Sequence, residues 1–341
     1  MRLRLWLAVG AGTVLVLAAA LWSARGRDVA TRLVTEWVPP QAAALPRDGD
    51  AERRAWEDLG QALAGRIVWS SNRTGNHELF LLELPAANLR QLTSNARVDF
   101  GARFSPDGTR IVFMRSRREW VSFRDKDSWD VMILDLVSGE QERVVRRGYH
   151  PTWGPGGESI VFARGGRVVR FDLETESETE IFDVAALGLG PEIWDPELHP
   201  DGDSLAVAIA HHGATVVTPG ETDPVRLTDH HVCQTTWVPG TRDLLWMDAS
   251  GNGGTRVMRG PADGSSAGEV FMDLPGTRSH EYFPRLSPDA EWLVWAATAE
   301  GHEHDRADYE IYAWRVGTPW DTAVRLTHFA GNDQWPDVFV D

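Results

Sequence analysis

Short apolar segments separated by turn residues recur along most of the chain. Five times an apolar run ends at a turn centred on Pro, and a second apolar run follows within a few residues. Pro fixes φ at the first central position of such a turn, Asp tolerates the second position, and Gly adopts the positive φ that returns the chain antiparallel. Each copy therefore predicts a β-hairpin. The turns and the runs that follow them are residues 104–108 and 111–113, 153–157 and 160–162, 198–202 and 205–207, 237–240 and 244–246, and 286–290 and 293–295.

The hairpins return at a regular interval. Counted from the residue that precedes each turn, they lie 39 to 49 residues apart. This period is typical of the four-stranded blades of a β-propeller, and short strands with a period of two fit half-buried antiparallel sheets better than helices. The pattern therefore predicts an all-β propeller. The residues that precede the five turns are Phe104, Trp153, Leu198, Trp237 and Leu286.

The two ends of the repeated region complement each other. Near the C-terminal end, residues 333–338 align with residues 281–286, but no turn or second strand follows them. Near the N-terminal end, residues 66–70, 78–82 and 89–93 have the pattern of three strands of a blade that has no innermost strand before them. We expect the C-terminal strand to complete this first blade, because the pairing closes a six-bladed ring and leaves no strand edge open.

Other residues repeat in phase with the blades. An acidic residue opens the expected third strand at Glu78, Asp130 and Glu310. Six Trp residues fall in expected strands, where their rings could fill the wedges between radial blades. Core packing is the favoured explanation for them, ahead of stacking on carbohydrate or bases. The six are Trp69, Trp153, Trp237, Trp246, Trp295 and Trp314.

The repeated residues resemble a known family. The pattern of an acidic residue, Pro, an aromatic or aliphatic residue, Ser-Pro-Asp-Gly and Ile-Val-Phe looks like the propeller repeat of TolB, the periplasmic component of the Tol system, and of TolB-like repeat proteins. The resemblance covers about residues 65–341 and implies a six-bladed propeller. Function needs its own argument, because a fold and an activity separate readily.

An apolar segment precedes the repeats. Residues 5–21 contain no charged residue, and two arginines flank them on either side. We predict one N-terminal apolar helix here, which is either an uncleaved membrane anchor or a signal peptide that is cut after Ala20. The length of the segment favours the anchor.

These features predict three parts of the chain. Residues 1–27 are a membrane anchor or signal segment, residues 28–64 are a linker with a short helix, and residues 65–341 are the six-bladed propeller. We expect a single-pass inner-membrane protein whose propeller lies in the periplasm and which contacts the membrane through the N-terminal segment only. With cleavage, the protein would instead be secreted or periplasmic.

The charge of the chain argues against several functions. Its 34 basic residues face 50 acidic residues, for a net charge of −16. A negative surface repels phosphate, so nucleic-acid binding and docking of the propeller on anionic lipid are not expected. Lys126 is the only lysine, so the chain contains no phosphate-binding loop of the Gly-Lys-Ser/Thr type.

A histidine-rich segment offers a candidate metal site. His302, His304 and Asp305 lie together in the expected loop between two strands of the blade near Leu286, and imidazole and carboxylate groups together could hold a transition metal. Residues two apart are neighbours on one face of a strand only when the strand is regular, so a loop conformation would decide whether these groups converge. A solvated polar loop without metal is the favoured explanation.

Three repeated acidic residues form a second candidate site. Asp99, Glu281 and Asp333 each begin an innermost strand, so they could gather at one mouth of the central channel and recruit a cation such as Ca²⁺. The alternative is that each carboxylate caps backbone N–H groups of the neighbouring blade. We favour this structural role, because the position recurs in several blades.

The favoured function is binding without catalysis. Long inserts at residues 115–128 and 298–308 interrupt two blades, and binding loops concentrate on such edges. We therefore expect a TolB-like propeller, tethered to the membrane, that binds a protein or peptide partner in the cell envelope and needs no cofactor. The alternative is a metal-dependent hydrolase or lyase that uses the histidine and carboxylate groups described above, with Ca²⁺ or a transition metal.

Overall fold

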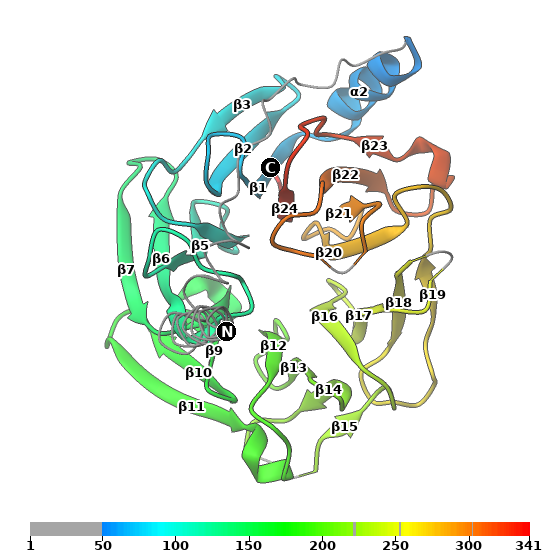
Figure 1. Ribbon diagram of the computed structural model, residues 1–341. Helices are drawn as coiled ribbons and strands as arrows, with labels where there is room; N and C mark the ends of the chain where they lie inside the picture. The colour runs from blue at the N-terminus through cyan, green and yellow to red at the C-terminus, as the bar shows by residue number, and fades with distance from the viewer. Residues whose placement is uncertain (1–49, 221–222, 252–253, 302) are drawn as a thin grey trace, which may run out of the picture. The chain divides into compact units, whose positions relative to one another are not determined.

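The computed structural model describes residues 50–220, 223–251, 254–301 and 303–341. These residues form six antiparallel sheets of four strands each, arranged around a central axis (Figure 1). The prediction of an all-β, six-bladed propeller is therefore confirmed. The predicted N-terminal apolar helix at residues 5–21 lies outside the described residues.

The blades follow one another along the chain, and each runs from an innermost strand to an outermost strand. Blades 1 to 3 contain, in that order, β24 (Asp333–Val340), β1 (Gly65–Ser71), β2 (Glu78–Leu84) and β3 (Asn88–Gln91); β4 (Asp99–Phe104), β5 (Arg110–Ser116), β6 (Trp129–Asp135) and β7 (Gln141–Arg146); and β8 (Tyr149–Trp153), β9 (Ser159–Arg164), β10 (Arg167–Asp172) and β11 (Ser177–Asp183). Blades 4 to 6 contain β12 (Ile193–Leu198), β13 (Leu205–Ile209), β14 (Gly213–Val217) and β15 (Val225–Arg226); β16 (Val232–Trp237), β17 (Asp243–Asp248), β18 (Arg256–Pro261) and β19 (Glu269–Met272); and β20 (His280–Leu286), β21 (Trp292–Thr298), β22 (Glu310–Arg315) and β23 (Val324–Arg325).

The C-terminal strand completes the first blade, as the sequence predicts. β24 pairs antiparallel with β1 from Gly65 opposite Val340 to Ser71 opposite Asp333. The innermost strands of successive blades contact one another around the whole ring, including β20 with β24 and β24 with β4. The ring is therefore closed by strand pairing between the two ends of the repeated region.

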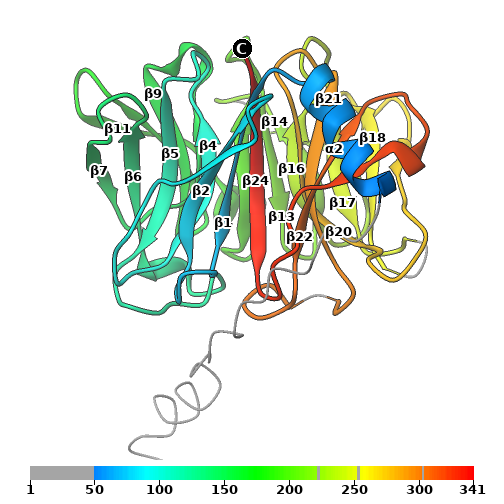
Figure 2. The ribbon, with the colours of Figure 1, turned by 90° about the horizontal axis from the view of Figure 1, so that it is seen from above.

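The Pro turns all lie on one side of the ring. They join the first and second strands of their blades, and we call this side the Pro-turn face; it is the upper side in Figure 2, where the C-terminus ends. Gly108 and Gly202 have the expected positive φ of 67° and 78°, and Ala290 adopts a φ of 58° at the equivalent position. We call the opposite side, where the long inserts emerge, the insert face.

The cores between the blades are built from the repeated apolar runs and from Trp. The Trp residues at the ends of β8 and β16 also link neighbouring blades: Trp153 Nε1 donates to the carbonyl oxygen of Arg103 at 3.0 Å, and Trp237 Nε1 donates to that of Glu197 at 2.9 Å. Trp69 and Trp295 are almost completely buried. Packing between blades is thus the structural role of these rings.

One helix packs on the outside of the ring. In the segment for which the sequence predicts a linker with a short helix, α2 (Asp50–Ala62) places Trp56 and Leu59 in the core, followed by buried Leu63. Trp56 Nε1 donates to the carbonyl oxygen of Arg325 in blade 6, and Gly60 lies close to Pro85 of blade 1. The helix therefore contacts blade 6 and blade 1, which are neighbours in the ring. Within the described ranges, no helix combines the length and the apolar character needed to cross a membrane.

Candidate functional site

Each innermost strand contains a β-bulge at the same position. The register with the second strand shifts there in all six blades, and a residue at the shift has a positive φ. A bulge re-aims the side chain that it carries. We call these six residues the bulge ring. They are Gly101, His150, Asp195, Gln234, Phe283 and Trp335.

Members of the bulge ring from neighbouring blades contact one another. His150 Nδ1 lies 2.9 Å from Asp195 Oδ1, the side-chain oxygen of Gln234 accepts a hydrogen bond from the backbone N–H of Phe283, and the ring centroids of Phe283 and Trp335 are 4.6 Å apart. Burial raises the pKa of Asp195, but His150 and the arginines nearby outweigh it and lower this pKa to about 2. The bulge ring is therefore a layer of packed side chains near the axis, with an ionised carboxylate in it.

Two residues after the bulge, every innermost strand places another side chain at the Pro-turn end of the channel. These six side chains, the mouth ring, line a depression of about 310 Å³. All six are polar, and four can carry a charge. They are Arg103, Thr152, Glu197, Thr236, Arg285 and Asp337.

The charges of the mouth ring compensate one another. Arg285 Nη1 donates to Glu197 Oε2 at 2.6 Å, across the width of blade 5. Burial and the proximity of Arg285 lower the pKa of Arg103 to about 10, against the opposing effect of Asp337. Burial also raises the pKa of Asp337, against the effect of the two arginines. The floor of the depression thus combines two buried guanidinium groups with two carboxyl groups in fixed positions.

The wall of the depression is mostly apolar. The Pro residues of the five turns line it together with the residues that precede the turns, among them Trp153 and Trp237. Most of the surface of these Trp rings is buried. The mouth on the Pro-turn face is therefore a concave, preformed surface with an apolar wall and a polar floor, which is the common composition of ligand-binding pockets.

The other end of the channel is occupied by the two long inserts. Ser122 Oγ donates to Asp305 Oδ2 at 2.6 Å, and the backbone N–H of Phe123 donates to Asp305 Oδ1 at 3.2 Å. The Phe123 ring packs edge-on against His304, with a centroid distance of 4.9 Å, and also contacts Trp335. We call Ser122, Phe123, His304 and Asp305 the plug. A cavity of only about 40 Å³ lies between the plug and the bulge ring.

The residues of the predicted histidine site have separate partners. His304 is buried, and its Nδ1 lies 3.0 Å from the hydroxyl group of Tyr309. Asp305 instead binds Ser122 and Phe123 and lies 3.5 Å from Arg124, and burial raises its pKa. His302 lies outside the described residues. The two described members of the predicted site thus both belong to the plug, although they do not face one another across a common site.

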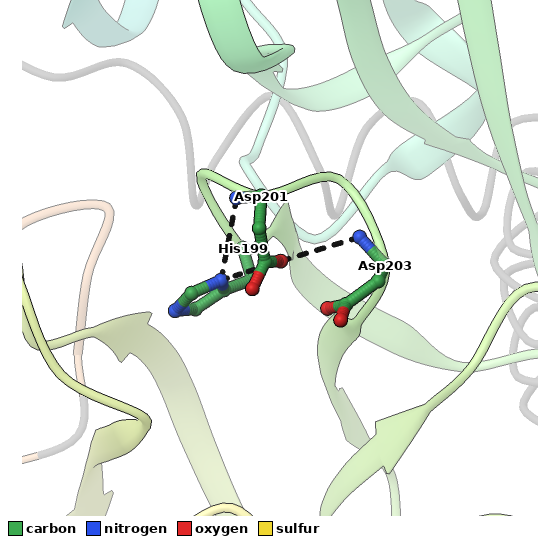
Figure 3. Close-up of side chains that lie close together, drawn as sticks. All are labelled: His199, Asp201 and Asp203. Atoms are coloured by element: carbon green, nitrogen blue, oxygen red, sulfur yellow. Dashed lines mark hydrogen bonds and ion pairs between the residues drawn. The ribbon is translucent and has the colours of Figure 1, made fainter.

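A different trio comes close enough to hold one ion. Among the described residues, His199, Asp201 and Asp203 are the one group of three such donors whose ligand atoms lie within 4.8 Å of one another (Figure 3). His199 Nδ1 lies 2.6 Å from Asp201 Oδ1. Arg242 Nη2 contacts both carboxylates, at 2.6 Å from Asp201 and 2.5 Å from Asp203. The guanidinium group already provides the positive charge that a cation would bring.

The predicted acidic residues are buried and separately paired. Asp99 binds Arg115 through both carboxylate oxygens, at 2.7 Å each, and Asp333 Oδ2 accepts from Arg73 at 2.8 Å. Glu281 accepts from the backbone N–H of Leu274, which belongs to the preceding blade, at 3.0 Å. The side chain of Thr255 lies 3.2 Å from Glu281. Burial raises the pKa of Glu281 to about 8.

Sequence reasoning missed the mouth ring, although the repeat contains a signal for it. In five copies of the repeat, the residue before the last residue that precedes the Pro turn is polar, and so is Asp337 at the equivalent position of the sixth copy, which has no turn. The strands that contain these residues are otherwise mostly buried. Successive side chains of a strand point to opposite faces of the sheet, so this polar residue points to the face opposite that of the apolar residue that follows it. Recurrence of polar residues at that one position could have indicated the channel lining.

Comparisons with known proteins support the fold. No protein-family model matches the chain. Over 113 residues the chain is 29% identical to the protein TolB homolog of Chlorobaculum tepidum; the match covers 30% of the chain and 24% of that relative, so it spans about a quarter of the relative's length.

Solved structures resemble the propeller more completely. TolB from Acinetobacter baumannii superposes with a TM-score of 0.61 and 16% identity, over 81% of this chain and 67% of that one. Putative TolB from Agrobacterium tumefaciens gives a TM-score of 0.57 and 14% identity, over 80% and 91%. An oligogalacturonate lyase in complex with manganese gives 0.50 and 17%, over 78% and 74%. At such identities the likeness concerns the fold alone. Together with the six closed blades, these likenesses show that the chain has the fold of a six-bladed β-propeller and that this fold is similar to that of TolB.

Proposed function

We propose that the protein is a non-enzymatic binding module of the cell envelope and that a protein or peptide segment binds at its Pro-turn mouth. The observation that carries the proposal is the mouth ring: six polar side chains in fixed positions on the floor of an open depression with an apolar wall. The likeness to TolB in sequence and fold supports a location in the envelope.

The composition of the mouth suits an extended protein segment. Prolines and aromatic residues give an apolar wall against which such a segment can pack, and buried arginines are frequent energetic anchors at protein interfaces. The Arg285–Glu197 pair holds both side chains in place before binding, so little side-chain entropy is lost when the partner arrives. Backbone and polar groups of the segment would then be matched to the polar floor.

The membrane attachment is part of the same proposal. We propose that residues 1–27 anchor the protein in the inner membrane as a single span, with the propeller in the periplasm, and that residues 28–64 act as the linker. The alternative is release into the periplasm after cleavage. N-terminal sequencing of the mature protein distinguishes the two, because cleavage after Ala20 would leave Leu21 as the first residue.

Filling the mouth tests the binding site. Thr152 is a half-exposed member of the mouth ring that carries no charge, so Thr152→Tyr adds a large ring to the depression without removing an ion pair. Envelope proteins cross-linked to the full-length chain should include a partner that is lost with Thr152→Tyr. The measurement is quantitative mass spectrometry of the cross-linked material.

The matched control places the same ring elsewhere. Thr179 is exposed on the outermost strand of blade 3, so Thr179→Tyr should leave the partner bound. A partner that is captured equally by both variants binds elsewhere, and the proposed site would then be rejected.

The metal-dependent hydrolase or lyase is the alternative proposal. Its support is the fold shared with an oligogalacturonate lyase in complex with manganese. Elemental analysis of the purified full-length protein and of its His304→Gln variant would test it. Stoichiometric metal that disappears in the variant would favour the enzyme over the binding module.

A further inference from the structure

The insert-side edge of blade 2 contains a pocket that the binding proposal does not use. It has a volume of about 320 Å³ and lies between the segment that leads into β4 and the outer strands β6 and β7. We call it the arginine pocket, because Arg97, Arg115 and Arg143 line it together with Asp130. It is separate from the mouth ring, which lies at the opposite end of the innermost strands.

The arginines of this pocket are unequally paired. Arg115 is fully engaged: it binds Asp99 through two hydrogen bonds and also donates to Gln141 Oε1 at 2.8 Å. Arg143 Nη1, in contrast, lies 3.7 Å from Asp130 Oδ2. The guanidinium group of Arg97 makes one long hydrogen bond, from Nη1 to the carbonyl oxygen of Ser116 at 3.4 Å.

A fourth arginine lies beside the pocket. Arg117 Nε is 3.6 Å from Asp130 Oδ1, so both ion pairs of this carboxylate are longer than a hydrogen bond. The close contact of Asp130 Oδ1 is instead the backbone N–H of Arg147, at 3.1 Å. Two guanidinium groups, those of Arg117 and Arg143, therefore share one carboxylate that neither binds closely, and Arg97 lines the same pocket as this carboxylate.

This local excess of positive charge is unusual for the molecule. The chain has a net charge of −16, and Arg115 is compensated by Asp99 with Glu78 also nearby. At the pocket, however, Asp130 is the carboxylate that pairs with Arg117 and Arg143, and Arg97 adds a further positive charge to the lining. Part of their side chains is exposed, at 39% for Arg117 and 45% for Arg143, so an ion from solution can reach them.

We infer that the arginine pocket binds a tetrahedral oxyanion of phosphate or sulfate type, either free or as the head of an ester. Guanidinium groups present planar pairs of N–H donors that match two oxygens of such an anion. Arg97 and Arg143 provide these donors in the lining of the pocket, and Arg117 lies beside the pocket at Asp130. The long contacts of Arg143 and Arg117 to Asp130 and of Arg97 to Ser116 leave the donors available. A dianion would also neutralise the positive charge of these arginines that the single carboxylate of Asp130 leaves uncompensated.

Inorganic phosphate is the first probe. Titration of the full-length protein, followed calorimetrically at low ionic strength, should show saturable binding with an apparent Kd on the order of 1 mM. Arg143→Gln and Arg97→Gln should each weaken it about tenfold, because each removes charge-assisted hydrogen bonds. Added KCl should weaken binding as well, since the site is partly exposed.

The carboxylate gives a test with the opposite sign. Asp130→Asn keeps an oxygen that can accept from the Arg147 N–H but removes the competing negative charge, so phosphate should bind several-fold more tightly. The matched control is Arg315→Gln, which removes a surface arginine of blade 6 that pairs with Glu291. This control should leave phosphate binding unchanged.

The identity of the esterified anion follows from two further probes. Preference for glucose 1-phosphate indicates a soluble ester, and preference for short-chain phosphatidic acid indicates a lipid headgroup. Absence of saturable phosphate binding would overturn the inference. The inference would also be overturned if phosphate bound equally well to Arg97→Gln, Arg143→Gln, Asp130→Asn and the wild type. The anion would then lie elsewhere on the protein.

Discussion

Three glutamates at the junctions between blades are buried as carboxyl groups. Burial raises the pKa of Glu78 and Glu310 to about 7 and that of Glu281 to about 8. The first two accept hydrogen bonds from Thr93 and Thr327. The acid that opens the third strand thus makes the same contact in blades 1 and 6, with a Thr that follows the fourth strand. Near neutral pH each of these carboxyl groups is therefore more often protonated in the folded chain than in the unfolded chain.

The sign of the pH dependence follows from these pKa values. An unfolded glutamate titrates near 4.5. Below that pH, Glu281 is neutral in both the folded and the unfolded state, so its burial does not lower the free energy of unfolding through ionisation. As the pH rises from about 5 to about 8, the unfolded state ionises more readily than the folded state, and the free energy of unfolding falls. Glu281 has no arginine or lysine among its hydrogen-bond partners described above, so this loss is not offset by an ion pair.

Glu281→Gln should therefore flatten the pH dependence of stability. The amide can still accept from the Leu274 N–H and can donate to Thr255. Between pH 5 and pH 8 the wild type should lose about 2–4 kcal/mol more of its free energy of unfolding than the variant does. Urea denaturation at several pH values measures this, with the exposed Glu300→Gln as control. Parallel pH profiles of wild type and Glu281→Gln would show that this carboxyl group does not titrate as described.

At this scale the sequence predicts some roles better than others. The glycines and prolines of the turns are predictable because their backbone geometry is local. The bulge ring is not, since Gln234, Phe283 and Trp335 adopt a positive φ although their residue types give no reason to expect it. Tertiary packing at the axis imposes that conformation.

At the scale of elements, the helix and the two inserts pack against different parts of the ring. α2 lies against the outside of blades 1 and 6, whereas the inserts of blades 2 and 6 meet at the insert-side end of the channel. The sequence predicts both inserts as interruptions of a blade. It does not predict their contact, because Ser122 and Asp305 lie 183 residues apart and no periodic pattern links them.

Removing apolar contact between α2 and the ring should lower stability. Leu59 is 2% exposed, so Leu59→Ala should reduce the free energy of unfolding by about 2–4 kcal/mol, through lost apolar burial and the cavity that remains. Glu57→Ala, on the exposed side of the same helix, is the matched control and should change it by less than about 0.5 kcal/mol. The midpoint of guanidinium denaturation measures both. Equal effects of the two variants would show that the helix does not contribute through this face.

At the scale of the whole molecule, one strand pairing holds the ring together. β1, β2 and β3 of blade 1 come from the N-terminal end of the repeated region, and its innermost strand β24 comes from the C-terminal end. Arg73 binds Asp333 across this junction, although the two residues lie 260 positions apart in the sequence. This closure was predictable, because the sequence shows a blade with three strands and a surplus strand far away. The sequence does not show which side chains meet at the axis once the ring has closed.

Removal of the closing strand should abolish cooperative unfolding. A chain that ends at Gln334 loses most of β24 and with it the partner of β1. Differential scanning calorimetry should then show a broad transition at lower temperature instead of one sharp transition. Deletion of Asp341 alone removes an ion pair with Arg66 that is largely exposed and should leave the transition nearly intact. A sharp, unshifted transition in the longer deletion would mean that the ring does not depend on this pairing.

Because the ribosome makes the chain from the N-terminus, the closure affects when the propeller is exposed to aggregation. β1 is synthesised long before β24, so its free edge must wait until nearly the whole propeller has been made. An unpaired edge invites pairing with other chains. A nascent or translocating copy is therefore most exposed to aggregation just before the last strand emerges, and a chaperone that shields the β1 edge would be of most use at that moment.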